Sequence, residues 1–114
     1  MNNEDAAGAL GALANAHRLR AFRALVNAAP EGLAAGELAE RVGLSPSALS
    51  FHLSQLQRAG LITSRRRERF IIYTVDVEAT RELVSFLTDD CCSGRPELCL
   101  REGADAADAL ENTA

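Results

Sequence analysis

The sequence predicts a mainly helical domain that carries one small β-hairpin. Hydrophobic residues make up 47% of the 114 residues, but aromatic residues only 4%, and an apolar set built on alanine and leucine favours helices. Apolar residues recur at helical spacing in several segments, and only two short runs are rich in β-branched and aromatic residues. A single domain of this size has a thin core, which is commonly remedied by sharing apolar surface with a second copy.

Three helices are predicted in the first part of the chain. Small and apolar residues at helical spacing predict the first over residues 4–14 and the second over about residues 16–27. The Pro-Glu-Gly sequence at residues 30–32 breaks the second helix. A third, short helix is predicted over residues 37–42 and is stopped by Gly43.

The fourth predicted helix has two faces of different character. Ser45 is a good N-cap, and Pro46 suits the first helical position because the N–H it lacks would be unpaired there anyway. Leucines at i, i+4 and i+7 predict a buried stripe, made of Leu49, Leu53 and Leu56. The opposite face presents small polar residues, one aromatic residue and one arginine, namely Ser47, Ser50, Phe51, Ser54 and Arg58. Gly60 ends this helix.

A β-hairpin and a fifth helix are predicted next. The runs 61–64 and 70–75 are rich in β-branched and aromatic residues and flank the basic sequence RRRER at residues 65–69, which is expected to form the hairpin tip. Asp76 or Glu78 begins a fifth helix that runs to about Asp90. The acidic, alanine-rich end of the chain fits either a frayed helix or a disordered tail.

Positive charge gathers in the middle of the chain, although the formal net charge is −4. Residues 1–44 hold five acids and four arginines, residues 45–75 hold one acid and five arginines, and residues 76–114 hold ten acids and three arginines. Because salt screens charges beyond a Debye length of roughly 10 Å, the middle segment can face phosphates while the tail stays acidic.

Two short helices, the second capped by Ser-Pro, followed by a hairpin with a basic tip, describe a winged helix-turn-helix. Small polar side chains allow a helix to enter the major groove, and an exposed Phe51 suits a thymine methyl. The hairpin arginines can reach the DNA backbone or an adjacent minor groove, although taken alone they fit a solvated loop equally well. The predicted DNA contacts are Ser45, Ser47, Ala48, Ser50, Phe51, His52, Ser54, Gln55, Arg65, Arg66, Arg67 and Arg69.

The two histidines fit packing roles. His52 lies beside the leucine stripe, and although it stays among the predicted DNA contacts, its position favours a packed, hydrogen-bonded residue over a base contact or metal ligand. His17 is expected to orient the turn between the first two helices.

Two stretches carry a family resemblance, LSPSALSFHLSQLQRAGLI at residues 44–62 and LANAHRLR at residues 13–20. The first resembles the recognition-helix signature of the arsenic-responsive ArsR/SmtB-type repressors, and the second resembles the opening of that family's second helix. The resemblance extends over roughly residues 6–92. It implies a homodimer, paired through its first and last helices, that sits on an inverted repeat of double-stranded operator DNA and dissociates when metal binds.

All three cysteines lie close together, at Cys91, Cys92 and Cys99. An odd number cannot be consumed by internal disulfides, and three thiolates brought together by the turn at Gly94 and Pro96 suit a thiophilic ion. Many members of the resembled family carry thiolates in the third helix, where this chain has none. The cluster resembles instead a subgroup of arsenite-responsive repressors with the site after the final helix.

Trivalent arsenic prefers three thiolates and needs no fourth ligand, whereas zinc takes four. We therefore expect As(III) as the inducer, with Sb(III) as a mimic and without an organic cofactor. An incidental cluster, a sensor of another soft metal, or a redox sensor in which Cys99 resolves an oxidised partner remain alternatives. A thiol enzyme or metal carrier is disfavoured because no acid/base pair or phosphate loop accompanies the thiols, so the protein is not expected to be an enzyme.

The predicted organisation is a winged helix-turn-helix DNA-binding and dimerisation domain over residues 1–92, a cysteine segment over residues 91–99 and an acidic tail over residues 100–114. The longest weakly polar stretch is too short to span a membrane, and the sequence starts without the basic region of a signal peptide. A cytoplasmic location is therefore expected.

Overall fold

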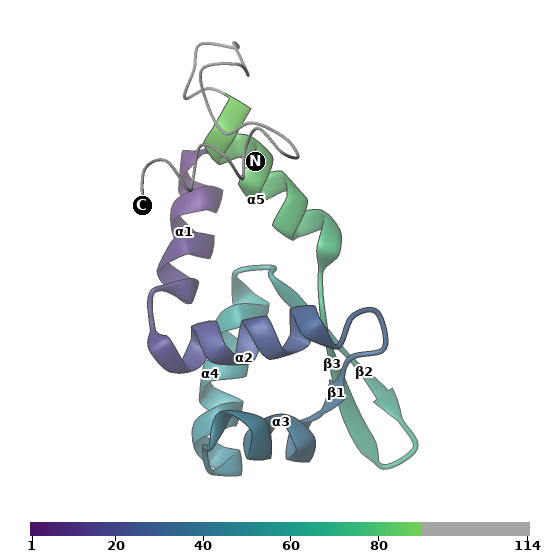
Figure 1. The fold of residues 1–114 in the computed structure, drawn as a ribbon. Helices are drawn as coiled ribbons and strands as arrows, with labels where there is room; N and C mark the ends of the chain where they lie inside the picture. The colour runs from purple at the N-terminus through teal and green to yellow at the C-terminus, as the bar shows by residue number, and fades with distance from the viewer. Residues whose placement is uncertain (90–114) are drawn as a thin grey trace, which may run out of the picture.

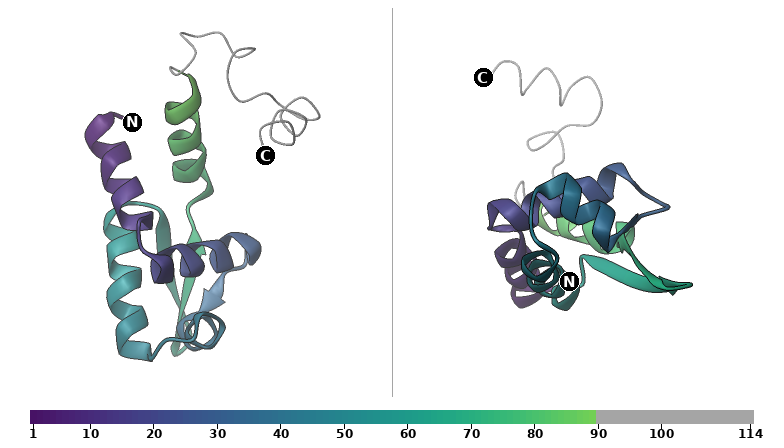
Figure 2. Two further views of the ribbon diagram at one scale, coloured as in Figure 1. Left: turned by 60° about the vertical axis from the view of Figure 1, so that its left-hand side comes forward. Right: turned by 90° about the horizontal axis from the view of Figure 1, so that it is seen from below.

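The computed structural model describes residues 1–89. Within them the elements are α1 (Asn3–Leu13), α2 (Ala16–Asn27), β1 (Leu33–Ala34), α3 (Ala35–Val42), α4 (Pro46–Arg58), β2 (Ile62–Arg67), β3 (Phe70–Val75) and α5 (Val77–Asp89). Helices α1 and α5 stand together at one end of the molecule, and α3 lies at the other end (Figure 1). The β2–β3 hairpin projects away from the helices as a wing (Figure 2). The predicted winged helix-turn-helix is confirmed.

Side-chain caps and glycines set the helix ends, and the bounds lie close to the predicted ones. The Asn2 side chain accepts a hydrogen bond from the N–H of Asp5 at 2.7 Å and caps α1. Asn15 caps α2 by accepting from the N–H groups of His17 and Arg18 at 2.9 and 3.1 Å. Gly43 ends α3 in the left-handed conformation, with φ of 72°, where a residue without Cβ is favoured. The predicted helix bounds, drawn mainly from apolar spacing, Ser45-Pro46 and the glycines, agree with the structure to within two residues.

The core lies where α2, α3, α4 and the start of β2 meet. Leucines dominate it: Leu25, Leu38, Leu49, Leu53, Leu56 and Leu61 are the largest fully buried side chains among the described residues. Burying one leucine contributes about 1.5–3 kcal/mol relative to exposure, so the predicted stripe of α4 is a main source of stability. No helix within residues 1–89 is long and apolar enough to cross a membrane.

The sheet has one strand more than the sequence predicts. Its order is β1-β3-β2, all antiparallel, with Leu33 opposite Tyr73 and Ala34 opposite Ile72. Gly32, with φ of 85°, permits the close approach, since a Cβ there would collide with the carbonyl oxygen of Tyr73. Strand β1 was missed because two residues carry no alternation pattern. The pairing ties the turn after α2 to the base of the wing.

Candidate nucleic-acid interface

Helix α4 presents a polar outer face opposite its buried leucines. Ser45 accepts a hydrogen bond from the N–H of Ala48 at 3.3 Å, and Pro46 occupies the first turn, so the helix begins as predicted. On the outer face Phe51 is 60% exposed, and Ser47 and Ser50 are exposed beside it. The face combines hydroxyl groups with one apolar ring. These are groups that can meet base edges and a thymine methyl.

The other predicted contacts of α4 are less open. Ala48, His52, Ser54 and Gln55 are half-buried. The Ser54 hydroxyl donates to the carbonyl oxygen of Phe51 at 2.9 Å, which leaves its oxygen only as an acceptor. The Ser45 hydroxyl oxygen is engaged in the cap. The exposed part of the predicted set on this helix therefore centres on Ser47, Ser50 and Phe51.

The wing arginines lie mainly in a strand and not at the tip, which corrects the sequence prediction. Strand β2 continues through Arg67, and only Glu68 and Arg69 form the turn. The reason is pairing: Arg65, Arg66 and Arg67 lie opposite Ile72, Ile71 and Phe70 of β3, and this ladder outweighs the low β-propensity expected of a charged run. All four arginines are exposed.

Two of these arginines are also bonded to the backbone. Arg65 donates to the carbonyl oxygen of Glu31 at 3.3 Å, and Arg66 donates to that of Glu68 at 3.3 Å. Because successive side chains of a strand point to opposite faces, Arg65 and Arg67 share one face of the wing and Arg66 the other. The basic wing is thus two-sided, with Arg69 at its turn.

Gln57 sets the wing relative to α4, a role that the sequence analysis missed. Its side-chain nitrogen donates to the hydroxyl of Ser64 in β2 at 3.0 Å. A glutamine near the end of a helix carries no sequence signal for such a contact, because its partner is reached only after the chain turns back at Gly60. The bond holds two predicted DNA-contacting elements in one orientation.

A histidine and arginine cluster lies behind the outer face of α4. The rings of His17 and His52 have centroids 5.6 Å apart, and a terminal nitrogen of Arg18 lies 3.4 Å from Nδ1 of His52. Burial, and after it the charges of Arg18 and His17, lower the pKa of His52 below its usual 6.5. His52 is therefore packed as expected, and its imidazole is favoured in the neutral form.

The turn between α1 and α2 is held differently from the expectation. Nδ1 of His17 is buried and has no hydrogen-bond partner among the described residues. The side chain of Asn15 makes the capping bonds instead. Of His17, only the backbone N–H takes part in the cap. The His17 ring packs against the ring of His52.

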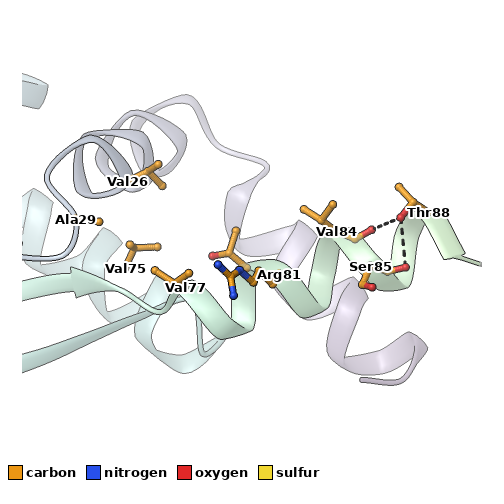
Figure 3. Close-up of a pocket in the computed structure, with 9 residues that line it drawn as sticks. Val26, Ala29, Val75, Val77, Arg81, Val84, Ser85 and Thr88 are labelled. Atoms are coloured by element: carbon orange, nitrogen blue, oxygen red, sulfur yellow. Dashed lines mark hydrogen bonds between the residues drawn. The ribbon is translucent and has the colours of Figure 1, made fainter. Parts of the chain in front are cut away.

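An apolar groove of about 590 Å³ runs between the end of α2, the end of β3 and α5. Val77, Val84 and Thr88 line it from α5, with Val26 and Ala29 facing them from α2 and the following turn (Figure 3). Exposed large apolar side chains lie on α1, on α5 and at the N-terminal residue, namely Leu10, Val77, Val84, Leu87 and Met1. The end of the molecule opposite the wing therefore has uncovered apolar surface.

The predicted metal ligands Cys91, Cys92 and Cys99 lie outside the described residues, as do the predicted cysteine segment and tail. Within residues 1–89 no group of three or more His, Cys, Asp or Glu side chains could hold a metal ion.

Comparison with known proteins agrees with this architecture. A family model described as a helix-turn-helix domain matches residues 13–65. The nodulation protein NolR of Rhizobium meliloti is 43% identical over 86 residues, which cover 75% of this chain and 68% of NolR. ArsR2 of Halobacterium salinarum, a protein named for an arsenical resistance operon, is 39% identical over 80 residues, covering 70% of this chain and 66% of that protein.

Solved structures of related regulators have a similar fold. NolR from Sinorhizobium fredii superposes with a TM-score of 0.61 at 40% identity, covering 80% of this chain and 86% of that one. An ArsR-like transcriptional regulator from Rhodococcus sp. RHA1 gives 0.65 at 26% identity, covering 74% and 76%. The homodimeric winged helix-turn-helix DNA-binding domain of Mb0332 from Mycobacterium bovis gives 0.63 at 25% identity, covering 74% and 76%. The chain belongs to the ArsR/SmtB-type family of winged helix-turn-helix transcriptional regulators.

Proposed function

We propose that the protein is an arsenic-responsive repressor that binds operator DNA as a homodimer and leaves it when trivalent arsenic binds Cys91, Cys92 and Cys99. The observation that carries the DNA-binding part is the outer face of α4, where the 60% exposed ring of Phe51 lies among serines. An exposed ring of this size, beside hydroxyl groups that match base edges, suits a recognition helix in the major groove.

The wing supports the same proposal. Its arginines belong to the segment of residues 45–75, which has five arginines against one acid, and the Gln57–Ser64 bond sets the wing beside α4. Arginines beside an inserted helix can neutralise phosphates and release counterions, which makes binding strongly salt-dependent. With α4 in the major groove, the wing would lie along the adjacent backbone.

The homodimer is proposed to form through α1 and α5. Val84 is 53% exposed on α5 and Leu10 42% on α1, and covering such side chains with a second copy is favourable at roughly 25 cal/mol per Å² of apolar area. The related domain Mb0332 is itself homodimeric. A two-fold dimer would present two copies of α4 to the half-sites of an inverted repeat.

The inducer is argued from the donor set. Thiolates are the ligands that soft, thiophilic ions prefer, and the chain holds three of them in residues 91–99. Cys91 and Cys92 follow closely on Asp89, the last residue of α5. An ion bound there would act at the end of a helix proposed to lie in the dimer interface, and a small change in the spacing of the two recognition helices would lose contacts on one side. Coupling of about 1–3 kcal/mol is ordinary for such a switch.

The test is a titration of the complex with DNA. A fluorescein-labelled duplex from the DNA immediately upstream of the protein's own coding sequence, called here the upstream duplex, would be bound by the protein and followed by anisotropy. We expect arsenite and antimonite to release it, and zinc and peroxide to leave it bound. Methylarsenite, which needs only two thiolates, would show whether inorganic or methylated arsenic is the better inducer.

Cysteine variants separate the sensor from the DNA-binding surface. Replacing any one of Cys91, Cys92 and Cys99 with serine should leave DNA affinity intact and blunt or abolish release by arsenite. Ser93→Ala, in the same segment, is the matched control and should respond like the unchanged protein. Full release in all three single variants would contradict the arsenic site, and release by peroxide in place of arsenite would favour the redox sensor.

A further inference from the structure

Arg18 contacts the helices on both sides of its own. It lies in the first turn of α2 and is half-buried. Its Nε–H donates to the carbonyl oxygen of Ala12 in α1 at 2.6 Å, and a terminal nitrogen lies 3.4 Å from Nδ1 of His52 in α4. One side chain therefore links the end of α1 to the helix that carries Phe51.

The contact with α1 satisfies the end of a helix. Ala12 is in the last turn of α1, where carbonyl groups have no partner within the helix. Helix α1 has no basic residue in its last turn, so Arg18 supplies from α2 both the donor and the positive charge that a helix C-terminus favours. A bond of 2.6 Å to a charged donor is of the strong class.

The contact with α4 constrains His52. A guanidinium group can only donate, so Nδ1 of His52 must offer its lone pair, and the ring is then neutral with its proton on Nε2. The same ring packs against the Phe51 ring in an edge-to-face arrangement, with the centroids 5.6 Å apart and the planes inclined by 66°. The orientation of His52 therefore bears directly on the exposed aromatic residue of the outer face.

We propose that Arg18 is a positioning residue for α4, which orients His52 and through it Phe51 by bridging the end of α1 to Nδ1 of His52. This inference rests on the proposed function of α4 as a recognition helix. It adds a residue that does not lie on the DNA-facing surface, and it connects that surface to α1, one of the two helices proposed to form the dimer.

The bridge makes α4 sensitive to protonation of His52. The charged and titratable groups that act on His52 are Arg18 and His17, both from α2, and with burial they lower its pKa. When Nδ1 takes up a proton it loses the lone pair that faces the guanidinium, and two positive charges then oppose each other. Acidification should therefore loosen the bridge.

The first test needs no DNA. Nitrogen-resolved NMR of the imidazole groups in the 114-residue protein should show His52 as the Nε2–H tautomer at pH 7.5. Arg18→Gln should raise the pKa of His52, because a positive charge is removed. Arg23→Gln, which removes an exposed arginine from the same helix, should leave that pKa unchanged. A His52 protonated on Nδ1 at pH 7.5, or an unchanged pKa in Arg18→Gln, would overturn the bridge.

The second test measures affinity for the upstream duplex. Arg18→Gln should weaken binding about tenfold at pH 7.5, the size expected for losing a hydrogen bond to a charged group, and Arg23→Gln less than twofold. Arg18→Lys should also bind more weakly while keeping the pKa of His52 low, because an ammonium retains the charge but not the fork that reaches two acceptors. Far-UV circular dichroism of each variant checks the fold.

A pH profile distinguishes positioning from simple structural support. His52→Asn keeps an acceptor oxygen near the place of Nδ1 but does not titrate, so its affinity should fall less than that of the unchanged protein between pH 7.5 and 5.5. Parallel profiles for the two proteins would refute the positioning role. If the unchanged protein binds the upstream duplex and Arg18→Gln binds it no more weakly than Arg23→Gln, the positioning role is refuted but the proposed function is not. An unchanged protein that binds no duplex would refute the proposed function as well.

Discussion

Phe51 is the residue on which the proposed DNA contact depends most. Its exposed fraction of 60% is the highest among the large apolar side chains of the described residues. Exposure of a single apolar residue is ordinary, but here the ring lies on the polar side of α4, opposite Leu49, Leu53 and Leu56. Apart from its contact with the His52 ring, the Phe51 ring adds little to folding and is open to contact a partner.

Phe51→Ala should weaken binding to the upstream duplex about tenfold, because a good base contact contributes about 1–3 kcal/mol. Thermal stability should be unchanged, since the ring is largely exposed. The matched control is Leu19→Ala, which removes another exposed apolar side chain and should bind as the unchanged protein does. Equal affinity of Phe51→Ala and Leu19→Ala would remove Phe51 from the interface.

His52 makes stability depend on pH at the residue scale. Its folded-state pKa is lowered, chiefly by burial, so the unfolded chain binds more protons between that pKa and 6.5. The contribution of neutral His52 to the free energy of unfolding should therefore be fully present above about pH 6.5. It should be lost progressively as the pH falls from there through the lowered pKa of the folded state. Urea denaturation between pH 7.5 and 5.5 measures this dependence, and His52→Asn should reduce it. An equally steep fall in His52→Asn would assign the effect to other groups.

The wing shows which elements the sequence could and could not predict. Helix bounds follow from local signals, namely apolar spacing, the Ser45-Pro46 cap and the glycines, so α1 to α4 were predicted to within two residues. The arginines of β2 were assigned to a loop because charge indicates solvent, yet their pairing with residues 70–72 makes them part of the ladder. Strand β1 and the Arg18 bridge arise from residues far apart in the chain, and no local pattern marks them.

Glu68 is an acidic residue at the turn of a basic wing, in the left-handed conformation with φ of 58°. Glu68→Asn should tighten binding to the upstream duplex a few-fold, because it removes repulsion from phosphates while asparagine tolerates this conformation. The gain should shrink as salt rises, since it is electrostatic. Anisotropy at several salt concentrations measures it. Unchanged affinity at low salt would indicate that the turn stays away from DNA.

At the scale of the whole molecule, the two ends have different surfaces. The wing and α4 carry arginine and serine, and α1 and α5, which lie at the other end of the ribbon in Figure 1, carry exposed apolar side chains. A second copy on the apolar end would leave both wings free. The family resemblance implied that the first and last helices pair with a second copy. No pattern in the sequence indicated the groove that Val26 and Ala29 complete, because it is lined by residues of α2, β3 and α5 that lie far apart in the chain.

Val84→Glu should convert the dimer to a folded monomer. A charge on a side chain that is 53% exposed in the single chain costs the monomer little, but burying it unpaired in an interface is expensive. Binding to the upstream duplex should fall with the loss of the second half-site contact. Sedimentation equilibrium measures the oligomeric state of Val84→Glu and of the control Leu19→Glu, which should remain a dimer. A dimeric Val84→Glu would exclude that face of α5 from the interface.

The most direct measurement of the arsenic claim is X-ray absorption at the arsenic edge of the arsenite-loaded, reduced protein. We expect an inner shell of three sulfur donors and nothing else. Oxygen or nitrogen donors in that shell, or fewer than three sulfurs, would contradict it.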